Sequence, residues 1–452
     1  MTHSIGTQLA QFSSQFKYED FPEDAIQFAK ILIMKTVAGM VAGARFPAAE
    51  KITSVIKTRN SSPEVGVIGH GFKASAWESV LALGVFAHAS ELEDDRFTAQ
   101  GGGSWDIGVL PVTIALAQRE KLSGKAFLEA SIVGLEVHCR TCNFPTSQLG
   151  LQMVPGAIGP AAGAARALGL DAVETANALG MAMSGPPIIS LNFGTDAHYF
   201  ESAMQNMHAV VAVDAARFGM TANPEIGRFM SRLFGRDRID QDTIVDGLGS
   251  KWYFEEIWVK KYPCCFGTHR QVDSLIELMS EHHLACEQIE SVVVDISRVD
   301  RVLDRPQPRD LGDLQFSLQY ALSAAMVDRD VTLEHFSETK VHDEKYLSQM
   351  SKVKISVHDD WPTGTMESPS VITLSTTDGR QFKKERRYAI GSPSDPLSME
   401  QCKQLFRKFT QGILPRDVTE NVLDSILNLE KLDSIEELMR PLTFPGNAGK
   451  HD

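Results

Sequence analysis

The sequence predicts a mainly α fold, with a large all-α helical domain and a smaller α+β domain. Three observations support this prediction. The chain has 452 residues, which is long for one hydrophobic core and favours two domains. Up to about residue 265 the apolar pattern is helical and rich in small residues, and no strand alternation stands out. Beyond that point several segments alternate with period two, as half-buried strands do.

Two segments support buried helices in the first domain. The stretch "AKILIMKTVAGMVAG" (29–43) is the most apolar early segment, but it contains Lys30 and Lys35. It is also short for a bilayer span, so we expect a buried helix. The segment 155–187 is dominated by Ala and Gly, with apolar positions on all sides, which predicts a closely packed pair of buried helices.

Strand patterns mark the second domain. The segments "SVVVDIS" (291–297) and "KVKISVHDD" (352–360) alternate between apolar and polar residues. The segment 370–391 contains two such runs joined at Asp378-Gly379, which is a strong signal for a β-hairpin. These segments predict a small sheet.

Helical patterns accompany these strands and resume after them. Residues 314–327 form an apolar helical pattern, and "GSPSDP" (391–396) is typical of a linker. Further on, Ser398 with Gln401 and Ser434 with Glu437 have the spacing of helix capping boxes. We expect this tail to return to the first domain. The predicted boundaries are 1–268 and 395–452 for the all-α domain, and 269–394 for the α+β domain.

Composition and charge exclude several classes of function. The formal net charge of −14 argues against a nucleic-acid surface, which needs clustered Lys and Arg. The N-terminus lacks the basic and apolar regions of a signal peptide, so we expect a cytoplasmic protein without membrane contact. In that compartment the six cysteines are expected to be reduced thiols.

Four carboxylates crowd the segment "ELEDD": Glu91, Glu93, Asp94 and Asp95. Repulsion between close carboxylates raises the pKa of at least one of them, which suits a general acid or base. A solvated acidic turn is the alternative, because Asp and Glu prefer the surface. The apolar "VLALGVFAHA" before the acids favours a buried site. Arg96 follows them and is a candidate to bind a substrate carboxylate.

Metal binding is a further alternative for this segment, since His88 lies three residues before Glu91. No EF-hand or H-x-x-x-H spacing occurs, so we expect no metal site. The segment "CRTC" (139–142) has the C-x-x-C form, but no second pair provides zinc ligands. Cys264 and Cys265 are adjacent and badly placed to bind one ion, and we expect thiols without a metal in both places.

Other polar residues are candidates for binding or proton transfer. His198 and Glu201 are three residues apart and share a helix face, and histidine exchanges protons near neutral pH. In "KKYPCCFGTHR", His269 and Arg270 lie near a helix N-terminus, where cations are unfavourable unless an anion also binds. This placement indicates a carboxylate-binding hinge. Tyr320 lies on an apolar helix, either with a site role or packed in the core.

With these residues assembled, the whole chain resembles the MmgE/PrpD family, which includes 2-methylcitrate dehydratase, cis-aconitate decarboxylase and iminodisuccinate epimerase. The resemblance implies a large helical domain closed from both chain ends, an α+β lid domain, and usually a homodimer. The matching segments, in family order, are "KTVAGMVAG" (35–43), "HASELEDD" (88–95), "VLPVTIALAQ" (109–118), "GLEVHCR" (134–140), "GAIGPAAGAARALGLD" (156–171), "FGT" (193–195), "KKYPCCFGTHR" (260–270), "FSLQYALSAAMVDRDVTL" (316–333) and "DP" (395–396).

The acid segment departs from the family motif H-A-x-D-[FY]-D-D. Glu91 stands where the motif has its first Asp, and Asp95 stands at a family Thr. The family then usually has a His-Pro pair, whereas this chain has a glycine run followed by Ser104 and Trp105. A second family histidine has no counterpart in residues 147–156.

The remaining family positions are partly kept. His198 stands at a family Lys and Glu201 at a family His, whereas Tyr320 matches the tyrosine of the decarboxylase-like members. Family chemistry removes a proton next to a carboxylate, then expels hydroxide, expels CO₂ or returns the proton to the other face. Such steps need a base, an acid and cations that stabilise enolate-like charge.

The sequence therefore predicts a lyase or isomerase without a cofactor, most simply a dehydratase of a hydroxy-carboxylic acid. An epimerase, a decarboxylase and a non-catalytic binding protein of the same family are the alternatives. With two histidines lost and a lysine replaced, the substrate is expected to carry less charge than a tricarboxylate. The predicted catalytic residues are Glu91 as the base, Asp94 and Asp95 assisting it, His198 as the acid or enolate stabiliser, and Tyr320 closing from the lid. The predicted binding residues are Arg96, Ser104, Trp105, Glu201, His269 and Arg270.

Overall fold

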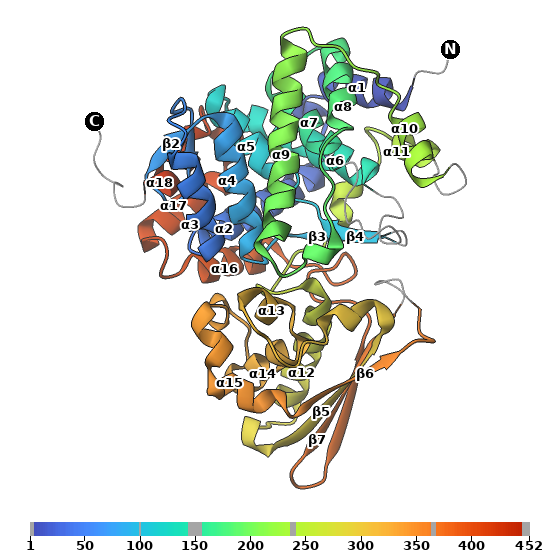
Figure 1. Ribbon diagram of the computed structural model, residues 1–452, viewed down its shortest axis with the longest axis vertical. Helices are drawn as coiled ribbons and strands as arrows, with labels where there is room; N and C mark the ends of the chain where they lie inside the picture. Colours follow the sequence, from blue (N-terminus) through green and yellow to red (C-terminus); the bar gives the residue numbers. More distant parts are fainter. Residues whose placement is uncertain (1–3, 99–100, 143–155, 236–240, 363–367, 445–452) are drawn as a thin grey trace.

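The computed structural model describes residues 4–98, 101–142, 156–235, 241–362 and 368–444. The fold is mainly α with small sheets, as predicted, and two domains lie one above the other in Figure 1. One hydrophobic core runs from Leu9 to Val259 and again from Leu397 to Leu442, and the other runs from Tyr262 to Leu374. The exact boundaries drawn from the sequence stay a prediction.

The helical domain packs long helices from both ends of the chain around α2. In chain order its helices are α1 (Ile5–Gln15), α2 (Glu23–Gly43), α3 (Pro47–Lys57), α4 (Ala76–Ala89), α5 (Leu110–Arg119), α6 (Gly124–Thr141), α7 (Ile158–Ala167), α8 (Ala172–Ala182), α9 (Asp196–Arg217), α10 (Ile226–Phe234), α11 (Asp242–Val245), α16 (Met399–Thr410), α17 (Arg416–Leu427) and α18 (Glu436–Thr443).

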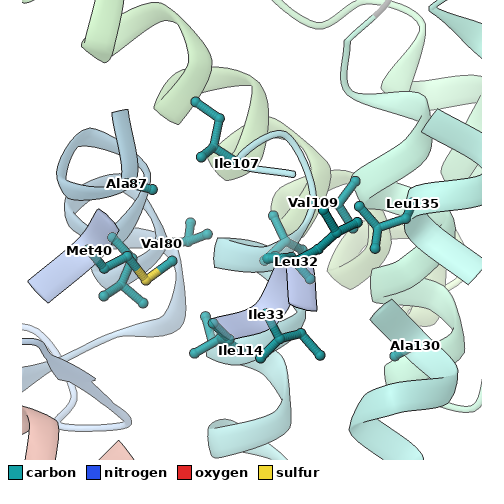
Figure 2. Packing of buried hydrophobic residues seen from close by; sticks show 14 of the residues in the cluster. Leu32, Ile33, Met40, Val80, Ala87, Ile107, Val109, Ile114, Ala130 and Leu135 are labelled. Carbon is teal, nitrogen blue, oxygen red and sulfur yellow. The ribbon is translucent and has the colours of Figure 1, made fainter. Parts of the chain in front are cut away.

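Helix α2 contains the apolar segment predicted to be a buried helix, and that prediction is confirmed. In Figure 2, Leu32 and Ile33 of α2 lie among apolar side chains that include Val109, Ile114 and Leu135. By length and composition α2 could cross a membrane, but 89% of its apolar window is buried inside the protein. Its apolar surface is therefore used by the core.

Two short antiparallel sheets interrupt this domain, so the expectation of a purely helical first domain is wrong in detail. Strand β1 (Val65–Val67) pairs with β2 (Phe72–Ala74), and β3 (Asp95–Thr98) pairs with β4 (Gly101–Ser104). Strands of three or four residues are too short to show an alternating pattern. Moreover, β4 consists mostly of glycines, which carry no side chains to alternate.

The lid domain has a four-stranded sheet in the order β6-β5-β7-β8. Strands β5 and β6 are parallel, and the other neighbours are antiparallel. The hairpin predicted at Asp378-Gly379 is confirmed, because Gly379 has a φ of 88° between the paired β7 and β8. The elements are α12 (His269–Glu281), β5 (Ile289–Ser297), α13 (Leu311–Phe316), α14 (Leu318–Asp328), α15 (Glu344–Met350), β6 (Val353–His358), β7 (Ser370–Thr376) and β8 (Gln381–Arg386).

Two findings refine the sequence prediction. The helix expected over 314–327 is broken at Ser317, whose hydroxyl accepts the backbone N–H of Tyr320 and so caps a new helix, α14. The C-terminal tail returns to the helical domain, where the backbone N–H of Gly69 bonds the carbonyl of Leu442 in α18. The capping box predicted at Ser398 is present at the start of α16.

Candidate active site

The acid segment follows α4 and is buried where the two domains meet. Helix α4 ends at Ala89, and Glu91 then adopts a left-handed φ of 52°. Asp95 begins β3, so the chain changes direction sharply between the helix and the strand. Glu91 is 1% exposed and Asp94 is 0% exposed. The alternative of a solvated acidic turn is therefore wrong.

A lysine that the sequence analysis did not single out lies among these carboxylates. The Nζ of Lys260 is 3.4 Å from Oε2 of Glu91 and 3.9 Å from Oδ2 of Asp95, and it forms an ion pair with Glu93. The same Nζ donates a hydrogen bond to the backbone carbonyl of Glu91 at 3.2 Å. A backbone bridge between Asp95 and Trp258 brings the segment that carries Lys260 against β3. One ammonium group thus serves three carboxylates.

Burial and charge shift the pKa values of this cluster. Burial raises the pKa of Glu91. Burial and the charge of Glu91 raise the pKa of Glu93 well above its usual value, and the charge of Lys260 acts against both shifts. Burial also raises the pKa of Asp95 to about 7. Burial lowers the pKa of Lys260, but the carboxylates outweigh it and raise that pKa well above the usual range. The cluster therefore places a cation beside carboxyl groups whose pKa values are raised, and among them Asp95 exchanges its proton near neutral pH.

A second group of buried polar residues fixes the position of the carboxylates and of Lys260. Oδ1 of Asp94 accepts the backbone N–H of Lys260 at 2.8 Å, and the backbone N–H of Asp94 donates to Oδ1 of Asp106 at 2.8 Å. From α2, Thr36 donates its hydroxyl to Asp106 at 2.5 Å, and the neighbouring Lys35 is fully buried. Asp94, predicted to assist the base, thus bonds backbone and fixes the position of Lys260.

Two buried histidines lie beside Glu91. His88 belongs to α4 and His198 to α9, and their ring centroids are 4.2 Å apart. Burial lowers the pKa of His88 well below its usual value and that of His198 to about 3, and the charge of Lys260 acts in the same direction. Both rings are neutral at pH 7, so they can donate or accept a hydrogen bond without adding charge.

Of three further predicted residues, Ser104 and Trp105 contact the acid segment, and His269 lies beside Phe266. The Ser104 hydroxyl hydrogen-bonds the Asp95 carboxylate and lowers its pKa against the effect of burial. The backbone N–H of Trp105 donates to the carbonyl of Asp94 at 2.9 Å, so this tryptophan braces the acid segment. His269 is buried and stacks on Phe266 with centroids 4.6 Å apart. These contacts make Ser104 and Trp105 neighbours of the carboxylates.

Four other predicted residues bond partners outside the carboxylate cluster. Arg96 bonds the carboxylate of Glu256 and the carbonyl of Cys139, because β3 alternates and turns it away from the Asp95 side. Arg270 pairs with Asp300 at 2.8 Å inside the lid domain. Each of these two arginines therefore already pairs with a carboxylate of the protein, and their roles in substrate binding stay predictions.

The remaining two predicted residues also have structural partners. Tyr320 lies in the lid core and donates its hydroxyl to the carbonyl of His335 at 2.7 Å, which matches the core alternative. Glu201 is half-buried on α9 and accepts the backbone N–H of Ile189 at 3.0 Å. Of the segment noted for its missing histidine, residues 147–155 lie outside the described residues.

Two cavities lie between the domains, and the lining of neither includes the clustered carboxylates, Lys260, His88 or His198. The first, of about 460 Å³, is lined by Lys51, Tyr199 and Arg309 among others, and Tyr199 lies in edge contact with His88. The second, of about 660 Å³, is lined by Arg45 and Phe409 among others. The ring of Phe409 lies under Nζ of Lys35 at 4.7 Å. Tyr199 therefore separates the first cavity from His88, and Phe409 separates the second from Lys35.

Comparisons with known proteins agree with this architecture. Family models of the MmgE/PrpD N-terminal domain and the MmgE/PrpD C-terminal domain match residues 7–229 and 262–431. Cis-aconitate decarboxylase of Mus musculus is 25% identical over 98% of this chain and 94% of its own length. The proteins of that name from Homo sapiens and Aspergillus terreus are 23% and 24% identical, each over 98% of this chain and 96% of their own length. With both domains matched along one chain, the protein belongs to the MmgE/PrpD family.

Proposed function

We propose that this protein is a lyase that needs no cofactor and acts by proton transfer at a carbon next to a carboxylate. Dehydration of a hydroxy-carboxylic acid is the reaction that we place first. The observation that carries the proposal is the buried cluster in which Glu91, Glu93 and Asp95 share the Lys260 ammonium beside two neutral histidines. Perturbed carboxyl groups enclosed with one cation are typical of sites for proton transfer.

In this mechanism Glu91 removes the proton next to the substrate carboxylate. The electron pair of the broken C–H bond moves toward the carboxylate, where the Lys260 ammonium and the imidazole N–H of His198 stabilise the enolate-like charge. The electron pair then forms the double bond, and the departing hydroxide takes a proton to leave as water. Asp95 can give that proton because its pKa is raised to about 7.

The charges of the cluster favour a substrate of low charge. Five buried carboxyl groups share two buried lysines, and the predicted arginines are neutralised elsewhere. Each further substrate carboxylate would add repulsion that nothing in the cluster offsets. A monocarboxylate or a small dicarboxylate fits better than a tricarboxylate. The acidic groups are Glu91, Glu93, Asp94, Asp95 and Asp106, and the lysines are Lys35 and Lys260.

Decarboxylation is a second candidate, because the relatives compared above carry the name cis-aconitate decarboxylase. In that case CO₂ leaves first, and a protonated Glu91 or Asp95 gives its proton to the carbon left behind. Epimerisation needs the same base and a donor on the opposite face. Burial of the acids around one ammonium group favours an enzyme over a non-catalytic binding protein.

The test is a panel of hydroxy and unsaturated carboxylic acids incubated with the protein in D₂O and followed by NMR. We expect loss of water from one hydroxy acid, with deuterium exchange at its α-carbon. Release of CO₂ with deuterium in the product would assign the decarboxylase instead, and inversion of a stereocentre the epimerase. No exchange or turnover across the panel would contradict proton abstraction.

Glu91→Gln is expected to lower kcat by about 100-fold or more, since removal of a general base costs roughly 10²–10⁴ in rate. The substitution keeps the size of the side chain, so the fold is retained. Glu290→Gln, at an exposed position on β5, is the matched control and should turn over like the parent protein. Equal rates for Glu91→Gln and its control would remove Glu91 as the base.

A further inference from the structure

Three side chains from separate parts of the fold converge at one buried point. His88 near the end of α4, Glu91 in the following turn and His198 near the start of α9 each offer a ligand atom, and these atoms all lie within 4.8 Å of one another. All three residues are buried. Within the part of the chain that the structure describes, His88 Nε2, Glu91 Oε1 and His198 Nδ1 have no hydrogen-bond partner.

The surroundings leave a lone pair on His88 facing this point. The hydroxyl of Ser202 donates its one proton to the carbonyl of Tyr199 at 3.0 Å. Nδ1 of His88 lies 3.0 Å from the same hydroxyl oxygen, and with the Ser202 proton on the Tyr199 carbonyl it is Nδ1 that carries a proton and donates. Nε2 is then the unprotonated nitrogen, which is the form that binds a metal. A second bond that fixes the ring in this way is usual for metal-binding histidines.

The two carboxyl oxygens of Glu91 have different surroundings. Its Oε2 faces Lys260 at 3.4 Å, and its carboxyl group also contacts the Glu93 side chain, whereas among the described residues no donor bonds Oε1. A cation beside Oε1 would also reduce the excess of buried negative charge, which otherwise makes each carboxylate raise the pKa of its neighbours.

We propose that His88, Glu91 and His198 bind one divalent transition-metal ion, with Zn²⁺ the ion that fits best. Two imidazoles and one carboxylate form a zinc ligand set that leaves a position open. The spacing rules applied to the sequence predict no metal here, because His198 is far from His88 in the chain. The site depends on α4 and α9 lying side by side.

This proposal stands on the ligand geometry and not on the proposed reaction. If Glu91 is also the base, a bound ion takes the electron pair that the base would use. Zn²⁺ would then inhibit turnover, so the protein would be most active after treatment with a chelator. Metal binding itself is measured without substrate, and its outcome is independent of which reaction the protein catalyses.

The experiment titrates ZnCl₂ into chelator-treated full-length protein by calorimetry and records the visible spectrum with CoCl₂. We expect one ion per chain and the absorption of a four-coordinate cobalt site. His198→Ala and His88→Asn should each weaken binding by roughly 10-fold or more. Circular dichroism checks that both variants are folded. His282→Ala removes an exposed histidine on the lid and should bind like the parent protein.

Two results would overturn the proposal. One is the absence of a stoichiometric binding event in the parent protein. The other is equal binding by the parent protein and by both folded site variants, which would indicate adsorption to surface groups. The use of two substitutions at different ligands keeps the test decisive if one variant fails to fold.

Discussion

Glu91 combines two unfavourable features at one residue. Its φ of 52° lies in the left-handed region, which costs a residue with a Cβ atom roughly 1 kcal/mol or more. Its carboxyl group is also buried beside those of Glu93 and Asp95. The hydrogen bond from its backbone N–H to the carbonyl of His88 and its contact with Lys260 hold this conformation. Strain of this kind usually persists where a side chain must point into a site.

The strain can be measured by comparing Glu91→Gly with Glu91→Ala. Both substitutions remove the carboxyl group, but only glycine adopts a φ of 52° without a steric cost. We expect the glycine variant to have the higher free energy of unfolding, by roughly 1 kcal/mol, in urea titrations. An alanine variant that is equally or more stable would show that the turn carries no strain.

At the residue scale, the sequence showed the crowded acids but not the cation that lies among them. The carboxylates are adjacent in the chain, so their crowding is visible in "ELEDD". Arg96 was the nearest positive residue in sequence and was assigned to the substrate, but it bonds Glu256. Lys260 could have been found from the need of buried acids for a counter-charge, since it opens the segment "KKYPCCFGTHR". Nothing local distinguishes it from Lys261.

At the scale of elements, α2 connects the core to the site. Lys35 and Thr36 lie near the middle of α2 and belong to the second group of buried polar residues, and the C-terminal part of α2, from Gly39 to Gly43, packs against α4. A Cβ built on Gly43 would lie 1.8 Å from the carbonyl oxygen of Phe86, whereas one on Gly39 would lie 3.4 Å from the carbonyl oxygen of Ala87. The close approach of the two helices therefore depends on Gly43 and tolerates a methyl group at Gly39.

This difference predicts opposite effects on stability. Gly43→Ala should lower the free energy of unfolding by about 1–3 kcal/mol, because α2 and α4 must move apart. Gly39→Ala, one turn earlier on the same helix, should leave stability unchanged or raise it by up to about 1 kcal/mol through helix propensity. Thermal and urea unfolding measure both variants. Equal destabilisation by the two would contradict the close contact at Gly43.

At the scale of the whole molecule, the buried cluster lies where the two domains meet. Gln315 of α13 in the lid domain accepts the hydroxyl of Tyr199 at 2.9 Å and donates to the carbonyl of Ala89 at 3.1 Å. The backbone carbonyl of Gln315 accepts the backbone N–H of Cys265 at 2.9 Å. One buried side chain thus joins α9, the end of α4 and the lid, directly beside the histidines and the acid segment.

Removal of this amide should loosen the junction without unfolding either core. In Gln315→Leu the Tyr199 hydroxyl and the Ala89 carbonyl lose their partner, at a cost of about 1–3 kcal/mol for groups that stay buried. We expect faster amide hydrogen exchange in residues 86–98 and 260–268, with unchanged exchange in the lid sheet. Gln319→Leu is the control, since Gln319 bonds Asp304 within the lid. Equal exchange in both variants would exclude a joining role for Gln315.

The sequence by itself determined the features that depend on neighbours in the chain. Helical and period-two patterns predicted the mainly α fold and the sheet, Asp378-Gly379 predicted the hairpin, and the apolar residues before the crowded acids predicted that these acids are buried. The resemblance of successive motifs predicted the family, which the matches to both domains confirm. The homodimer and the cytoplasmic location stay predictions.

Only the tertiary structure decided which side chains share the buried site. It placed Lys260 among the acids, joined His198 to His88 and left Tyr320 in the lid core. The physical reason is that local patterns record which face of an element is apolar, but not which elements pack together or at what register. Charge pairing in a buried site is decided by that packing, because only a cation within a few ångströms offsets a desolvated carboxylate.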